Sequence, residues 1–161
     1  SNTSGIKIGI TRQSQIPTRW IDQGALQALP ILQVSQRYHA GLIEHAFRTY
    51  LNDRTNWRNM LKNEVDPVDL FAVYQTYWPQ VKPTLSDDLL ADVEELARPD
   101  AVLSLEYPAL KYPIKVTSFN LDKNPRAEGV LEAIKGQYLI FDSGVINIRK
   151  YGGYLVSIES F

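Results

Sequence analysis

The sequence predicts an α+β fold with three parts, and three observations support this prediction. Residues 1–64 carry two short strand patterns and a strongly amphipathic helix pattern. Residues 65–100 are helical in pattern and rich in acidic side chains. From residue 101 the pattern changes to short strands separated by turns. We therefore expect a small sheet with flanking helices (1–64), an acidic helical connector (65–100) and a C-terminal antiparallel β-barrel-like domain (101–161).

The first part is predicted to contain two strands and three helices. Residues 5–11 alternate isoleucine with glycine and polar residues, which predicts a half-buried strand. A short helix is expected over 17–24, because proline suits a first helical position and glycine suits the position after a helix end. Residues 29–35 are expected to form a second strand, and 57–64 one or two further helical turns. The main helix is expected over 38–51, and its apolar face consists of Leu42, Ile43, Ala46, Phe47, Tyr50 and Leu51.

The acidic connector is predicted to hold two helices. The first covers 67–78 and is expected to stop at Pro79 and Pro83. The second covers 86–97, with Ser86 as N-cap and aspartates in its first turn. The last part contains six candidate strands, which are 102–107, 112–119, 128–134, 136–142, 144–150 and 153–159.

Composition narrows the function classes. The chain has no cysteine and only two histidines, which excludes a disulfide framework or a thiolate zinc site within these residues. No apolar run reaches membrane-spanning length, so we expect no membrane association and a cytoplasmic location. Residues 1–60 hold seven basic and three acidic side chains, whereas residues 61–100 hold three basic and nine acidic ones. The arginine-rich first part is therefore the expected site of any anionic ligand.

Glu44 is the first candidate site residue. At about 100° per residue it falls at the edge of the apolar stripe of helix 38–51, with Arg37 and Arg48 on the same flank. A carboxylate at this edge is half-buried and still reaches a cleft, which suits a single metal ligand. The alternative is structural, because Glu44 and Arg48 also have the spacing of a helix salt bridge.

The order of these elements resembles the GIY-YIG nuclease superfamily. The resemblance rests on a strand with "KIGIT", an arginine about ten residues later, a second strand, and a helix with a central glutamate. It is closest to the branch whose second motif reads Lys-Ile-Gly. The wider run "GIKIGITRQSQIPTRWIDQGALQALPILQV", with "DRTNWRNML" and the stretch from "FNLDKNP" to "YGGY", also resembles a bacterial domain family of unknown function.

The nuclease resemblance implies a role for each matching residue. Gly9 lets the backbone approach the active centre, and Arg19 binds the scissile phosphate. Glu44 binds one divalent cation, commonly Mg²⁺. The implied catalytic residues are Lys7, Arg19 and Glu44, and the expected nucleic-acid-binding residues are Gly9, Thr11, Arg12, Arg37, Arg48 and Asn56.

Two departures from the superfamily pattern affect this prediction. Lys7 replaces the second-motif tyrosine, and the first-motif strand is expected to precede Ser1, in a segment that carries cysteine in longer relatives. The function expected from the sequence is metal-dependent phosphodiester cleavage in DNA or RNA. The alternatives are a non-catalytic nucleic-acid-binding module and a protein-interaction scaffold that uses the acidic connector. The last part offers two hypotheses: a structural barrel that completes the domain, or a nucleic-acid-binding patch whose members are Tyr138, Arg149, Lys150, Tyr151 and Tyr154.

Overall fold

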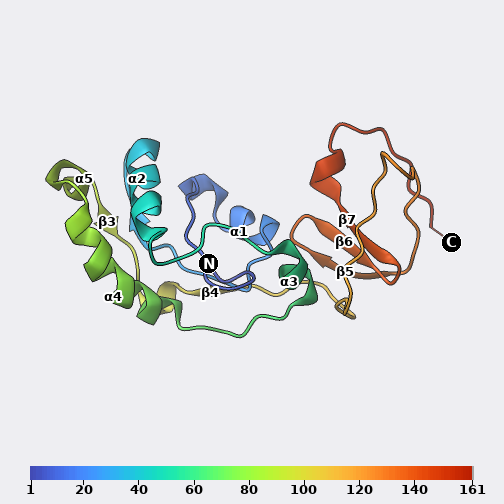
Figure 1. Cartoon of the computed structure of the whole chain (residues 1–161), viewed down its shortest axis with the longest axis horizontal. Coiled ribbons are helices and arrows are strands. Elements are labelled where there is room, and N and C mark those ends of the chain that lie inside the picture. The colour runs from blue at the N-terminus through green and yellow to red at the C-terminus, as the bar shows by residue number, and fades with distance from the viewer. Residues whose placement is uncertain (161) are drawn as a thin grey trace.

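The computed structural model describes residues 1–160 and confirms the α+β class. The helices are α1 (Thr18–Asp22), α2 (Arg37–Phe47), α3 (Trp57–Lys62), α4 (Leu70–Val81) and α5 (Asp87–Ala91). The strands are β1 (Gln27–Ala28), β2 (Leu32–Gln33), β3 (Glu94–Glu95), β4 (Leu103–Ser104), β5 (Leu131–Lys135), β6 (Tyr138–Phe141) and β7 (Gly144–Asn147). Figure 1 shows α2, α4 and α5 at one end of an elongated molecule and the sheet β5–β6–β7 at the other.

Short strand pairs join the first part of the chain to the middle. β1 pairs antiparallel with β4, and β2 pairs antiparallel with β3. In both pairs the second strand lies more than sixty residues beyond the first in the sequence. Residues 65–104 therefore return to the first part and contribute to its sheets.

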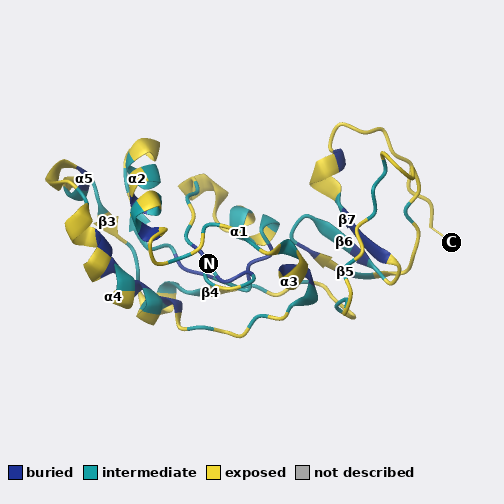
Figure 2. Ribbon diagram, viewed as in Figure 1, coloured by how far each residue is buried: buried dark blue, intermediate teal, exposed yellow. Residues whose placement is uncertain are grey.

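The larger core lies between α2 and α4. Phe47 of α2 is 1% exposed and stacks on Trp78 of α4, with ring centroids 6.1 Å apart. The buried members of this core are Leu29, Ile43, Phe47, Leu70, Tyr74, Trp78, Val81 and Leu89. As Figure 2 shows, buried residues of α2 and α4 face each other while the outer surfaces of both helices are exposed. The amphipathic pattern of 38–51 thus predicted the buried face correctly for Ile43 and Phe47. It was wrong for Leu42 and Tyr50, which are exposed, and the helix ends at Phe47 instead of residue 51.

A second core joins α3 to the C-terminal sheet. Met60 and Leu61 of α3 are buried against Ala133, Ile140 and Val145 of the three strands. Beside this core, the ring of Trp57 stacks on that of Tyr138 at a centroid distance of 5.7 Å. The α3 helix therefore packs the first part of the chain against the last.

Several elements differ from the sequence prediction. Residues 5–11 form only isolated bridges, from Ile6 to Asn2 and from Lys7 to Asn52, instead of a full strand. The helix expected over 86–97 ends at Ala91, because the backbone of Glu94–Glu95 pairs with β2 instead. Pro79 lies inside α4 and does not end it; the helix continues to Val81, which is completely buried.

The last part forms an open sheet within residues 1–160 rather than a closed barrel. Its strand order is β5–β6–β7, and all pairs are antiparallel. The segments 112–119 and 153–159 are mostly irregular, although Ser118 bridges to Val145 along one edge and Ala109 bridges to Ala133 along the other. None of the helices described in this structure is both long and apolar enough to cross a membrane.

Candidate functional site

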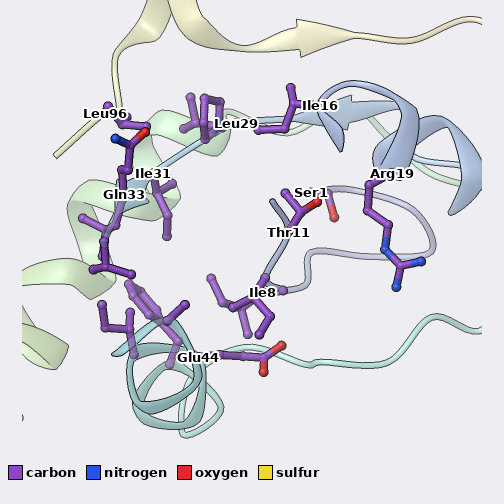
Figure 3. A pocket seen from close by; sticks show the side chains of 18 of the residues that line it. Ser1, Ile8, Thr11, Ile16, Arg19, Leu29, Ile31, Gln33, Glu44 and Leu96 are labelled. Carbon is purple, nitrogen blue, oxygen red and sulfur yellow. The ribbon is translucent and has the colours of Figure 1, made fainter. Parts of the chain in front are cut away.

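A cleft of about 830 Å³ opens between residues 6–11, α1, the β2 segment and α2. Figure 3 shows Arg19 and Glu44 on one side of the segment that carries Ile8 and Thr11. On the other side lie Leu29, Ile31 and Leu96. The cleft therefore has a charged region and an apolar region, which is the usual composition of a ligand-binding site.

Most of the residues predicted from the sequence meet in this cleft. Those that line it are Lys7, Gly9, Thr11, Arg12, Arg19, Arg37 and Glu44. Arg48 does not line the cleft, but it pairs with Glu44 from the next turn of α2. The structure thus brings together residues that span 38 positions of the sequence.

Lys7 is the most buried charged residue of the cleft. Lys7 is only 9% exposed, although the alternating pattern of residues 5–11 placed it on the polar face of the predicted strand. Burial lowers the pKa of Lys7, and the positive charge of Arg19 lowers it further, while Asp53 and Glu44 act in the opposite direction. An ammonium in this setting both attracts an anion and loses its proton more readily than a surface lysine.

Glu44 reaches the cleft but already has a cationic partner. Its carboxylate is 3.5 Å from the guanidinium of Arg48, which also lies 3.1 Å from the carboxylate of Asp53. The side chain of Glu44 is 18% exposed, so it is accessible to a ligand. The salt bridge anticipated from the i,i+4 spacing is therefore present and extends to a second acid.

Arg19 is available for an anionic ligand. It forms no ion pair with any side chain of residues 1–160, and it lines the cleft from the single long turn of α1. The end of α1 is fixed by Tyr107, whose hydroxyl donates toward the carbonyl oxygens of Ile21 (3.2 Å) and Ala25 (2.9 Å). An unpaired arginine on an anchored helix suits the binding of a phosphate.

The cleft provides few protein ligands for a divalent cation. The described residues contain no group of three histidine, cysteine, aspartate or glutamate side chains arranged to hold a metal. Mg²⁺ is commonly held by one or two carboxylates together with water and the phosphates of its substrate. Glu44, with Asp53 nearby, fits that mode and does not fit a site built from protein ligands alone.

Asn56 lies outside the cleft and has a structural role. It is the N-cap of α3, where its side-chain oxygen accepts hydrogen bonds from the amides of Arg58 and Asn59. Its own amide donates to the hydroxyl of Ser4 at 2.8 Å. These bonds explain why an asparagine stands at this position without any ligand.

The aromatic patch considered for the last part is largely committed to internal contacts. Tyr138 stacks on Trp57, and Tyr151 is buried with its hydroxyl accepting from the amide of Leu121. Tyr154 and Lys150 both interact with Asp122. These contacts leave few free ring faces for stacking on bases.

Asp53 does not line the cleft, but it is a charged neighbour of the site that sequence reasoning missed. It contacts Arg48 and influences the pKa of Lys7, yet it lies in the irregular segment after α2. Helical spacing carries no information past the end of a helix, so only its closeness in sequence to Arg48 could have suggested it.

Comparison with known proteins gives one match. A family model described as "Protein of unknown function (DUF2797)" matches residues 1–156. No curated protein and no solved structure matches the chain.

Proposed function

Because the chain belongs to the DUF2797 family of unknown function, we propose a function from its cleft alone: binding and metal-dependent cleavage of a nucleic-acid phosphodiester. The observation that carries the proposal is the meeting of Lys7, Arg19 and Glu44 in one cleft. These residues come from three separate segments, and their side chains match the needs of phosphoryl chemistry.

Each side chain has a distinct task in this proposal. Arg19 has no competing ion pair within residues 1–160 and would bind the phosphate through its planar guanidinium. Lys7 would act as the base: its lowered pKa favours loss of its own proton, and in the resulting neutral form its amine would accept a proton from the attacking water and become an ammonium beside the phosphate. When bound, Mg²⁺ would polarise the phosphate, and Glu44 would hold it together with water and substrate oxygens.

A second function is favoured by the state of Glu44. Its carboxylate is already paired with Arg48, which competes with a cation for the same oxygens. A cleft that keeps Arg19 and Lys7 while its glutamate is occupied would bind nucleic acid without cutting it. The alternative function is therefore a non-catalytic module that binds DNA or RNA in the cytoplasm. A third prediction is that the acidic segment 65–100 serves as a scaffold for other proteins.

The experiment combines a binding assay with a cleavage assay. Fluorescently labelled single-stranded and double-stranded DNA and RNA oligonucleotides are incubated with the protein and Mg²⁺ or Mn²⁺. Arg19→Ala and Glu44→Gln are compared with Arg98→Ala, which changes an exposed arginine that lies outside the cleft and pairs with Asp100. We expect Arg19→Ala to weaken binding about ten-fold and to reduce the slope of affinity against salt by about one.

The outcomes separate the candidate functions. Cleavage that needs the metal and disappears in Glu44→Gln, with binding retained, supports the nuclease proposal. Binding that depends on Arg19 without any cleavage supports the non-catalytic module. If no oligonucleotide binds, or Arg98→Ala weakens binding as much as Arg19→Ala does, the cleft is not a nucleic-acid site.

A further inference from the structure

The end of α1 packs against the C-terminal sheet. The turn between β5 and β6 approaches α1 so closely that a Cβ added at Gly136 would stand 2.9 Å from the carbonyl oxygen of Asp22. In the same turn, the carbonyl oxygen of Gln137 accepts a hydrogen bond of 2.9 Å from the amide of Ile148. Ile148 begins η4 (Ile148–Tyr151), a short 3-10 helix that directly follows β7. The turn therefore holds η4 close to the end of α1.

Arg149 of η4 is a largely exposed cation on a fixed backbone. Its side chain is 67% exposed, and its guanidinium lies 3.9 Å from the carboxylate of Asp22. An ion pair at this distance between two solvent-accessible side chains is weak. The backbone of η4 is fixed because Tyr151 is buried and the side chain of Asn147 accepts a hydrogen bond from the amide of Lys150. Arg149 is thus positioned by the fold and is free to exchange Asp22 for a stronger anionic partner.

Arg149 and Arg19 meet at the same face of α1. Arg19 and Asp22 are three positions apart in this helix, so their side chains are neighbours on one face. Arg19 lines the cleft, whereas Asp22 and Arg149 lie outside it. In Figure 1, α1 lies between α2 and the sheet β5–β6–β7, so α1 separates the cleft from η4. A nucleic-acid strand that leaves the cleft across this face of α1 would therefore reach Arg149.

We propose that Arg149 binds a second phosphate of the nucleic-acid strand, outside the cleft, while Arg19 binds a phosphate inside it. This inference rests on the proposed function. A nucleic-acid strand carries one phosphate per nucleotide, about 3.4 Å apart along the axis of a duplex, so one strand can supply both phosphates. The bound phosphate replaces Asp22, because paired hydrogen bonds from a guanidinium to phosphate oxygens are stronger than a contact of 3.9 Å. The substrate is then an oligonucleotide that continues past α1, and a mononucleotide occupies only the cleft.

The test compares Arg149→Ala with Asp22→Asn, because both variants remove the same ion pair and are expected to have opposite effects. Affinity for the labelled oligonucleotides described above is measured by fluorescence anisotropy at several salt concentrations. We expect Arg149→Ala to weaken binding about five-fold and to reduce the slope of affinity against salt by about one. Asp22→Asn frees Arg149 and removes a nearby negative charge, so it is expected to tighten binding about two-fold.

The matched control is Arg126→Ala. Arg126 also lies in the last part of the chain, its side chain is 68% exposed, and it pairs with Glu128. We expect this variant to bind like the original protein. A second control uses thymidine monophosphate as a competitor. Its affinity is expected to fall in Arg19→Ala and to stay unchanged in Arg149→Ala, because a single phosphate fills only the cleft.

The outcomes distinguish a phosphate contact from a structural one. If the contact between Arg149 and Asp22 served only to hold the C-terminal sheet against α1, both variants would weaken binding, and this result overturns the inference. An equal loss in Arg149→Ala and Arg126→Ala, or a lower affinity of Arg149→Ala for thymidine monophosphate, also overturns it. Binding that depends on Arg19 but not on Arg149 overturns this inference alone. A lack of any oligonucleotide binding overturns the proposed function together with it.

Discussion

Replacing Lys135 with methionine is expected to remove about 2 kcal/mol from the rise in stability between pH 7 and pH 9.5. Lys135 is completely buried at the end of β5, and it forms no ion pair with an acid in residues 1–160. Its ammonium donates to the side-chain oxygen of Asn63 at 2.6 Å and lies 5.5 Å from the ring centroids of Tyr107 and Tyr112. These contacts compensate only part of the hydration that the charge loses.

The size of the effect follows from the pKa of the buried group. Burial lowers the pKa of Lys135 from 10.5 to about 8. Between these values the unfolded chain binds the proton and the folded chain does not, so the free energy of unfolding increases as the pH rises. The full difference corresponds to about 3 kcal/mol, of which about 2 kcal/mol develops between pH 7 and pH 9.5.

The assay is urea unfolding followed by circular dichroism at half-unit pH intervals from 7 to 9.5. Higher pH is avoided because burial raises the pKa of Tyr107 and of Tyr112. These tyrosines stay protonated in the folded state and ionise in the unfolded state near pH 10, which lowers stability there. Lys135→Met is expected to lose the rise of about 2 kcal/mol, and an equal rise in the variant and the original protein would refute the reasoning.

Three further predictions concern other parts of the molecule. Asn56→Ala removes the N-cap of α3 and is expected to lower the free energy of unfolding by about 1 kcal/mol in urea unfolding. Gly136→Ala is expected to lower it by about 1–3 kcal/mol, because Gly136 has φ +59° and an added Cβ would stand 2.9 Å from the carbonyl oxygen of Asp22. Arg48→Met frees Glu44 and is expected to tighten Mn²⁺ binding in titration calorimetry, while stability changes by less than about 1 kcal/mol.

Each of these predictions has a result that contradicts it. Asn56→Ser should retain most of the capping, so an equal loss in Asn56→Ser and Asn56→Ala would remove capping as the cause. A stable Gly136→Ala protein would mean that the hairpin turn can move away from α1. Unchanged Mn²⁺ affinity in Arg48→Met would show that Arg48 does not control access to Glu44.

The sequence predicted the helices better than the strands. The spacing of Ile43 and Phe47 predicted the buried face of α2, because a helix presents its apolar residues at a fixed period. The strands β1 to β4 have two residues each, which is too short for an alternating pattern to be read. Their pairing also depends on contacts between distant segments, such as β2 with β3, that local sequence does not encode.

Helical spacing placed Glu44 at the edge of the apolar stripe, because α2 is a regular element. The grouping of Lys7, Arg19 and Glu44, which line one cleft, was implied only by the nuclease resemblance, and their roles stay a prediction. Asn56 was misplaced by the same reasoning, because the capping position of a helix after an irregular loop has no fixed spacing from the strands. Nothing in the sequence predicted that Lys135 is buried, since a lysine at the end of a strand pattern is usually exposed.

The bond from Tyr107 to the end of α1 affects how this protein can be cut into fragments. The hydroxyl lies 86 residues beyond Ile21 in the sequence, yet it satisfies carbonyl oxygens at the end of the helix that carries Arg19. A fragment that stops before Tyr107 would keep all the charged residues that line the cleft. It would lose the hydrogen bonds that hold the end of α1, the helix that carries Arg19. A fragment that keeps the cleft intact therefore has to extend past Tyr107, well beyond the residues that line the cleft.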